Sequence, residues 1–252
     1  MGNSKLVTYT KLSPHCNKPR NHAIDTITIH CFVGQVTAER GCAVFANPLR
    51  LASCNYVVGY DGSIGLCVDE ANRSWCSSNK ANDHRAITIE VASDNKAPYT
   101  VTDKAYDALI RLCADICKRN NIKKLLWKAD KNLIGKVDKQ NMTVHRWFAN
   151  KACPGEYLYN RLGDIAEKAN KLLGVKEEAK VDAFVPYKVK VIKPPLNIRS
   201  GPGTNYPVVG TIKETGVYTI VEEAKGNTTY PWGKLKSNAG WCSMSPSYVK
   251  KV

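Results

Sequence analysis

His145-Arg146-Trp147-Phe148-Ala149-Asn150-Lys151-Ala152-Cys153-Pro154-Gly155 is the most informative stretch of this sequence. It holds an imidazole at His145 and, eight residues later, a thiol at Cys153. A second imidazole is available at His30, where the alternation of polar and apolar residues over 26–29 ends, a pattern typical of a β-strand. Two imidazoles and one thiolate make a good tetrahedral set for zinc, with the fourth position open for water. Spacing alone is weak support, because a single His or Cys is more often structural than a ligand.

Strand-like and helix-like stretches alternate before residue 174. The β-rich runs cover residues 26–30, 55–58, 64–68 and 87–91, and the turn at Asp61-Gly62 makes the second and third of them a hairpin-like pair. Apolar residues recur at helical spacing over residues 103–120, and a second long helix is expected over 156–173. Strands that alternate with helices predict an α/β layer fold.

The composition changes after Gly174. Residues 175–183 are charged and lack aromatic side chains, which indicates a linker, although a continued helix is the alternative because Glu, Ala and Lys favour helices. From residue 184 the chain has short β-type segments with Gly, Pro and Asn between them, over residues 189–192, 208–212, 218–222, 233–236 and 240–243. Evenly spaced short strands predict a small all-β barrel or sandwich. We therefore expect two domains, residues 1–174 and 184–252, joined by residues 175–183.

The formal net charge of +15 favours polyanionic partners, such as nucleic acid or an anionic cell wall. The charge is spread along the chain without a run of basic residues, which argues against a nucleic-acid-binding arm. Residues 184–252 are denser in charge, with 10 Lys and Arg against 3 Asp and Glu. The alternative is that the basic charge serves solubility alone.

The sequence lacks an apolar run long enough for a transmembrane helix, and its polar start does not resemble a secretory signal. We therefore expect a protein made in a cytoplasm, without a membrane partner, that needs another route if it acts outside. The ten cysteines include no CxxC pair. Most of them are expected to be free thiols that pack as small apolar side chains.

Three stretches resemble the N-acetylmuramoyl-L-alanine amidase type 2 family, which shares its fold with the peptidoglycan recognition proteins. They are residues 27–30, 55–64 and 145–155, and their order and separations fit the family over about residues 20–173. The resemblance implies a central mixed β-sheet flanked by helices. It also implies that His30, His145 and Cys153 hold Zn²⁺ for hydrolysis of the amide bond between N-acetylmuramic acid and L-alanine in peptidoglycan. Non-catalytic members commonly lose the cysteine, so its presence favours an enzyme over a receptor that only binds peptidoglycan.

Two further residues are expected to act in catalysis. Lys151 matches a family lysine that stabilises the tetrahedral oxyanion. One branch of the family uses a tyrosine as base, but Cys54 occupies that position here, and Tyr56 two residues later qualifies only if the alignment is shifted. Other members use a glutamate on a central strand, and Glu90 in the run 87–91 matches it. Because a carboxylate within an apolar run is costly without a role or a partner, Glu90 is the predicted base, with a structural ion pair as the alternative.

Two residues are predicted to bind substrate. Trp75 lies in Arg73-Ser74-Trp75, which resembles a segment that lines the family's substrate groove, and its indole is expected either to stack on a sugar or to pack internally. Arg146, beside a predicted zinc ligand, is expected either to meet a carboxylate of the stem peptide or to pair within the protein.

Residues 196–210 closely resemble the opening of a bacterial SH3 domain, and residues 232–235 and 240–242 fit its later strands. Such domains usually bind wall peptides or other wall polymers, and the basic excess suits an anionic Gram-positive wall. An amidase followed by this small SH3-like barrel, without a signal peptide, resembles a phage endolysin that acts on the wall after release from the host cytoplasm. The alternatives are a bacterial autolysin with the same chemistry, a non-catalytic peptidoglycan-binding protein and, on charge alone, a nucleic-acid-binding protein.

Overall fold

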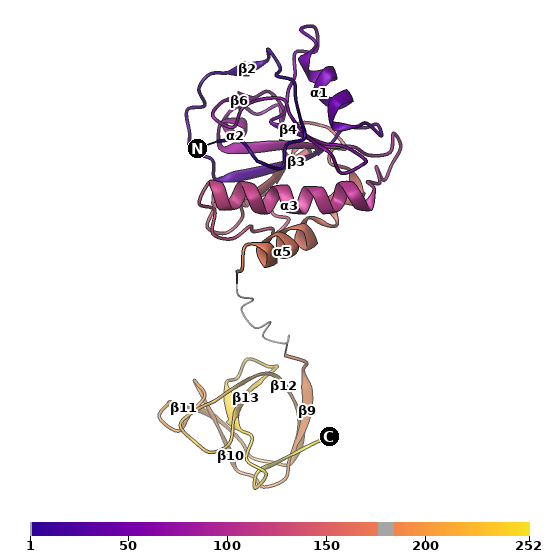
Figure 1. The fold of residues 1–252 in the computed structure, drawn as a ribbon. Coiled ribbons are helices and arrows are strands. Elements are labelled where there is room, and N and C mark those ends of the chain that lie inside the picture. Colours follow the sequence, from indigo (N-terminus) through magenta and orange to yellow (C-terminus); the bar gives the residue numbers. More distant parts are fainter. Residues whose placement is uncertain (1, 176–183) are drawn as a thin grey trace. The chain divides into compact units, whose positions relative to one another are not determined.

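The computed structural model describes residues 2–175 and 184–252, which form two compact units, Met1–Lys176 and Glu177–Val252. Each unit is described by itself (Figure 1). The predicted linker over 175–183 lies, apart from Val175, outside the described residues. The domain boundaries at residues 174 and 184 stay predictions.

Six strands form the central sheet of the first unit, in the order β1-β5-β4-β7-β3-β8. Along the chain they are β1 (Tyr9–Thr10), β3 (Thr26–Cys31), β4 (Tyr56–Val58), β5 (Ile64–Leu66), β7 (Ala86–Val91) and β8 (Met142–Val144). The sheet is mixed, because β4 and β5 pair antiparallel and the other neighbours pair parallel. The expected mixed sheet and the hairpin-like pair of β4 and β5 are therefore confirmed. A separate two-stranded sheet joins β2 (Cys16–Asn17) to β6 (Arg73–Ser74).

The central strands β3 and β7 are buried on both faces, so their polar side chains need partners. The Oγ1 atoms of Thr28 and Thr143 lie 2.8 Å apart, and Asn82 Nδ2 donates to Thr28 Oγ1 at 3.0 Å. These hydrogen bonds offset the cost of taking the threonine hydroxyls out of water. The parallel register pairs His30 with Glu90, so two of the predicted site residues are neighbours across the sheet.

Helices cover the two faces of the sheet, with α3 and α5 packed together on one face and α1 on the other (Figure 1). Their bounds are α1 (Ala38–Ala46), α2 (Lys80–Arg85), α3 (Asp103–Arg119), α4 (Gly155–Tyr159) and α5 (Leu162–Leu172), with short 3-10 turns η1 (Lys131–Leu133) and η2 (His145–Trp147). The start of α3 is capped by Thr102, whose side chain accepts a hydrogen bond from the backbone N–H of Ala105 at 3.2 Å. The helix expected over residues 103–120 is confirmed.

The single helix expected over residues 156–173 is wrong, because the chain forms two helices, α4 and α5, in that range. Asn160 ends α4, and Arg161 departs from helical geometry with φ −110° and ψ 0°. Asn is a weak helix former that favours helix ends. The break covers only residues 160–161, so the apolar residues on either side of it still follow helical spacing and the sequence pattern does not reveal it.

The second unit is one antiparallel sheet of seven strands, in the order β11-β10-β14-β13-β12-β9-β15. Figure 1 shows the strands curving around a common interior, which is filled by apolar side chains such as Val191, Ile220 and Leu235. The strands are β9 (Tyr187–Val191), β10 (Leu196–Arg199), β11 (Val208–Ile212), β12 (Gly216–Ala224), β13 (Trp232–Leu235), β14 (Trp241–Ser243) and β15 (Val249–Lys251). The expected all-β fold is confirmed, and β10 and β15 are additional to the expected strands.

All ten cysteines are free thiols in the structure, and seven of them are buried. This agrees with the expectation that most of them pack as small apolar groups. Within the part of the chain that the structure describes, no helix has the length and apolar character needed to cross a membrane.

Candidate metal centre

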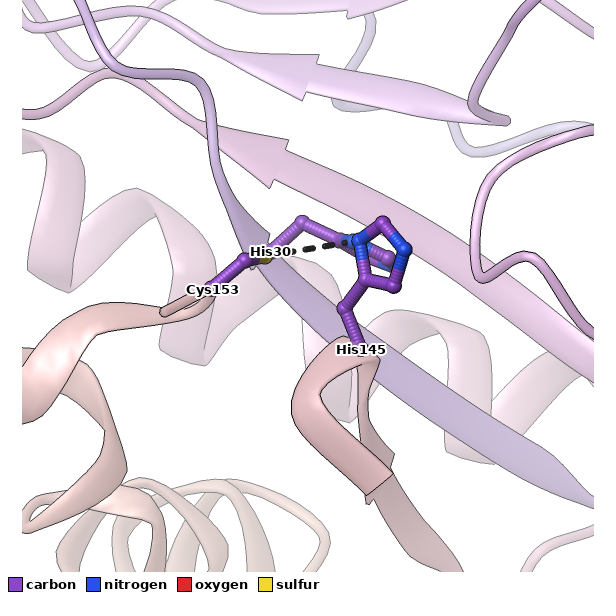
Figure 2. Close-up of side chains that lie close together, drawn as sticks. All are labelled: His30, His145 and Cys153. Carbon is purple, nitrogen blue, oxygen red and sulfur yellow. Dashed lines mark hydrogen bonds between the residues drawn. The ribbon is translucent and has the colours of Figure 1, made fainter. Parts of the chain in front are cut away.

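His30, His145 and Cys153 meet at one edge of the central sheet (Figure 2). His30 is fully buried, and its Nδ1 atom lies 3.4 Å from Cys153 Sγ. The rings of His30 and His145 approach edge to face, with centroids 5.0 Å apart. One nitrogen or sulfur atom from each of the three residues lies within 4.8 Å of the other two. The predicted ligand set is therefore brought together.

The strand topology explains why these residues meet. β3 and β8 are parallel neighbours, so their carboxyl ends lie at the same edge of the sheet, and β8 continues directly into η2, which begins at His145. The backbone N–H of Arg146 then donates to the carbonyl of Cys153 at 3.1 Å, which returns the loop to the site. Gly155 allows the close approach that follows, because a Cβ there would lie 2.8 Å from Tyr99 Cβ and its φ is +80°.

The donor set fits a zinc ion. Burial, with a smaller contribution from the neighbouring His145, lowers the pKa of His30 to about 3, so this imidazole is neutral and able to bind a metal. Its Nε2 atom is buried without a hydrogen-bond partner. In the absence of a cation, the hydrogen bond with Cys31 and burial raise the pKa of the Cys153 thiol, and a divalent ion would oppose both effects. Two imidazoles and a thiolate are borderline-soft ligands of the kind that zinc prefers.

Ser78 is a residue of the site that the sequence did not indicate. Its hydroxyl lies 3.0 Å from Nε2 of His145, and its backbone has φ +60°, a left-handed conformation that costs energy for any residue other than glycine. A hydrogen bond at one ring nitrogen fixes the orientation of an imidazole and leaves the other nitrogen for a metal. A single serine in a loop has no pattern that marks such a role.

Glu90 lies beside the ligand set. Its Oε1 atom is 4.0 Å from His30 Nδ1, and its Oε2 atom is buried without a hydrogen-bond partner. The carboxyl group is 15% exposed, and burial raises its pKa to about 8. A carboxyl group with a pKa near neutrality can both accept and release a proton at the pH of most enzymes.

A groove with a cavity volume of about 590 Å³ opens next to Glu90 and His145. Lys151 and Trp75, both expected in the site, also line it. Trp75 Nε1 donates to Asn17 Oδ1 at 2.9 Å, which fixes the edge of the indole. The groove has four cationic side chains, since Arg50, Arg73 and Lys80 line it together with Lys151. Among Arg50, Arg73 and Lys80, only Arg73 lies in a segment that was predicted from the sequence to line the substrate groove.

Arg146 is half-buried, pairs with groups of its own chain and does not line this groove. Its Nη1 atom donates to Glu156 Oε1 and its Nη2 atom to the carbonyl of Ala152, both at 2.6 Å. The guanidinium also lies 4.6 Å from the centre of the Tyr159 ring. These contacts correspond to the internal pairing that was one of the two expectations for Arg146, and a role in substrate binding stays a prediction.

Tyr56, the alternative base, is fully buried. Its hydroxyl donates to Glu70 Oε1 at 2.6 Å and accepts from the backbone N–H of Ser4 at 2.9 Å. Arg119 holds the same carboxylate from the other side, so the phenol is part of a closed network. Neither Tyr56 nor the buried Cys54 lines the groove. Glu90, in contrast to Tyr56, lies beside the ligand set and lines the groove, and the identity of the base stays a prediction.

Comparisons with solved structures return chains of similar fold at low sequence identity. PlyL matches with a TM-score of 0.47 and 16% identity, over 64% of this chain and 95% of that chain. A mutant endolysin from Bacillus subtilis matches with a TM-score of 0.45 and 18% identity, over 65% and 98%. A selenomethionine derivative of AmpD matches with a TM-score of 0.47 and 17% identity, over 65% and 96%. No curated protein sequence matches the chain.

Two family models match the sequence. The model of the bacterial SH3 domain matches residues 194–250, within the second unit. The model described as N-acetylmuramoyl-L-alanine amidase matches residues 20–156, more than half of the chain, and this range includes His30, Glu90, His145 and Cys153. The chain therefore belongs to the N-acetylmuramoyl-L-alanine amidase family and has a bacterial SH3 domain at its C-terminal end.

Proposed function

We propose that this chain hydrolyses the amide bond between N-acetylmuramic acid and L-alanine in peptidoglycan, with one zinc ion held by His30, His145 and Cys153. The observation that carries the proposal is the convergence of these three side chains beside Glu90 and an open groove. When bound, zinc polarises the amide carbonyl and increases the acidity of water. The protein supplies the base, the charge for the oxyanion and the substrate site.

Glu90 is the proposed general base. It takes a proton from the attacking water and then passes that proton to the leaving amine of L-alanine. Burial raises the pKa of its carboxyl group to about 8, so near neutral pH the group can accept a proton as a base and release it as an acid. Its position opposite His30 in the parallel register holds the carboxyl group beside the metal ligands.

Lys151 is proposed to stabilise the negative charge that develops on the carbonyl oxygen. It is exposed and lines the groove on the same loop as Cys153, two residues before it. A cation aimed at a developing oxyanion stabilises the transition state more than the ground state, which is the condition for catalysis.

The groove is proposed to bind the stem peptide. Arg50, Arg73 and Lys80 give it positive charge, and Trp75 supplies an aromatic face for a sugar or an apolar side chain. The SH3 domain, over residues 184–252, is proposed to bind wall peptides or anionic polymers of a Gram-positive wall. A linker over residues 175–183 then keeps the catalytic domain, residues 1–174, at a raised concentration near the wall. Such a protein would serve as a phage endolysin or, with the same chemistry, as a bacterial autolysin.

Digestion of purified cell wall tests this proposal. The expected products are new amino groups of L-alanine, without new reducing sugar ends, and their release should stop when zinc is chelated. New reducing ends would instead identify a glycosidase. Binding to the wall without any new ends would identify a protein that only binds peptidoglycan.

A further inference from the structure

His30 lies in a second group of possible metal ligands besides the one described above. One ligand atom each from His30, Cys76 and Glu90 lies within 4.8 Å of the other two. Cys76 comes from the segment after β6 and Glu90 from β7, whereas Cys153 lies in the loop between η2 and α4. The two groups share His30 and no other residue.

The distances suit a single small cation. Cys76 Sγ lies 3.8 Å from Glu90 Oε1, which in turn lies 4.0 Å from His30 Nδ1. In a tetrahedral zinc site, with bonds of about 2.0–2.3 Å, neighbouring ligand atoms are about 3.3–3.6 Å apart. The two printed distances are slightly longer than these separations, and the third pair, His30 and Cys76, lies within 4.8 Å, so side-chain rotations bring the group to tetrahedral spacing. Cys76 and Glu90 both line the groove, so an ion reaches them from solvent.

The carboxyl group of Glu90 has one oxygen atom without a partner. Among the described residues, four buried side-chain nitrogen and oxygen atoms have no hydrogen-bond partner, and two of them belong to His30 (Nε2) and Glu90 (Oε2). Glu90 Oε2 is therefore able to take a ligand without breaking a hydrogen bond, whereas His30 faces Glu90 with Nδ1, so its unpaired Nε2 does not bear on this group. Thiolate, imidazole and carboxylate together are a ligand set that zinc accepts.

We propose that His30, Cys76 and Glu90 form a second, alternative position for the metal ion. The inference rests on the proposed zinc site, because His30 Nδ1 faces both groups and one ion occupies one position or the other. Binding at the second position replaces the Cys76 thiol proton, which goes to solvent, by the metal. An ion there has Glu90 as a ligand, so the proposed base is occupied and His145 and Cys153 are free. The chain thus holds zinc in a form that does not hydrolyse peptidoglycan.

Cobalt(II) substitution in the full chain tests this inference. A thiolate bound to cobalt gives an intense near-ultraviolet charge-transfer band, whereas nitrogen and oxygen ligands do not. Cys153→Ser removes the sulfur of the first position. We expect the Cys153→Ser protein to bind cobalt more weakly than wild type and to keep a charge-transfer band. Adding Cys76→Ser to this variant should abolish the band.

Cys31 provides the matched control, because its thiol hydrogen-bonds with Cys153 but does not belong to the second group. The Cys31→Ser, Cys153→Ser protein should keep the band. Absence of the band in Cys153→Ser at saturating cobalt would overturn the inference. So would a band that survives Cys76→Ser, since another thiol would then be the ligand.

The outcome for wild type separates this inference from the proposed function. If wild-type protein binds no cobalt, the zinc site itself is refuted. If wild type shows a thiolate band and Cys153→Ser shows none, the first position stands and only the second is refuted. Circular dichroism verifies folding of each variant, and Cys153→Ala takes the place of Cys153→Ser if the serine variant does not fold.

Discussion

At the scale of single residues, the proposed metal site is centred on His30, because the other candidate ligands and Glu90 lie around its imidazole. This imidazole is fully buried, pairs with Glu90 in the sheet register and lies against Cys153. Burial keeps it neutral, and a neutral imidazole is the form that binds a metal. We therefore expect a substitution at any of these neighbours to weaken metal binding more than it lowers the stability of the fold.

Loss of the Cys153 thiolate should weaken zinc binding and abolish amidase activity, because a hydroxyl is a much poorer zinc ligand than a thiolate. Elemental analysis after dialysis and release of L-alanine amino groups from cell wall measure the two effects in Cys153→Ser. Cys16→Ser is the control, since Cys16 is a half-buried free thiol in β2 and belongs to neither metal group. Full activity in Cys153→Ser would remove this residue from the site.

Glu90 should make the stability of the zinc-free protein depend on pH. Its pKa is about 8 in the folded chain and about 4.3 in an unfolded one. Between these values the folded protein keeps a proton that the unfolded chain has released, so the free energy of unfolding falls as the pH rises. Urea denaturation with a chelator, at about pH 5 and about pH 8, should show a smaller fall for Glu90→Gln than for wild type. Equal falls would contradict the shifted pKa.

The proposed metal ligands were predictable from the sequence because the stretches that contain them resemble the amidase family. His30 ends an alternating run, and His145 and Cys153 share one short motif. Ser78, Arg50 and Lys80 were not predictable, because they reach the site through loop conformation and tertiary packing.

At the scale of elements, the site is built by the parallel pairing of β3 with β7 and β8. Short β-type runs in the sequence indicate that such strands exist, but not their order or register. The resemblance to a family therefore implied a mixed sheet, but the strand order was not predicted. The break between α4 and α5 was not predictable, because both helices keep apolar residues at helical spacing on either side of it.

Arg20 should be important for joining the segment before β3 to α2 and β7. Its guanidinium donates to the backbone carbonyls of residues 70, 72, 83, 84 and 86, at 2.6–3.4 Å. Arg20→Ala leaves these carbonyls without their donor and should lower the free energy of unfolding by about 3 kcal/mol or more. The exposed Lys18 is the control, and Lys18→Ala should change stability by less than about 0.5 kcal/mol. Similar urea midpoints for the two variants would contradict this role.

At the scale of the whole molecule, the chain joins a unit of the amidase family to a strongly basic bacterial SH3 domain. In the second unit Lys190 and Lys250 lie directly opposite each other on β9 and β15. Both are exposed, and among the described residues neither has an ion-pair partner. Like charges opposite each other across strands are unfavourable, so an anionic partner would stabilise this face. Charge composition alone indicated a basic domain, but only the strand register shows which lysines are neighbours.

Reversal of charge at these two lysines should weaken binding to an anionic wall. We expect the Lys190→Glu, Lys250→Glu protein to bind purified Gram-positive wall about tenfold less tightly at low salt, with a smaller salt dependence. Sedimentation of wall with bound protein measures this, and cleavage of a soluble muropeptide should stay unchanged. Lys213→Glu, Lys225→Glu makes the same change in net charge at other exposed positions. An equal loss in that control would show that net charge matters and this face does not.

The stacked indoles beside the site have an optical consequence. Trp147 follows His145 within the turn η2, and its ring lies parallel to that of Trp127, with centroids 5.1 Å apart and planes 7° apart. Two chromophores at this separation share their excitation, so their ultraviolet dichroism and fluorescence depend on the spacing of the rings. Because one ring is tied to a proposed ligand, the chain has a built-in spectroscopic reporter of order in the loop that carries His145.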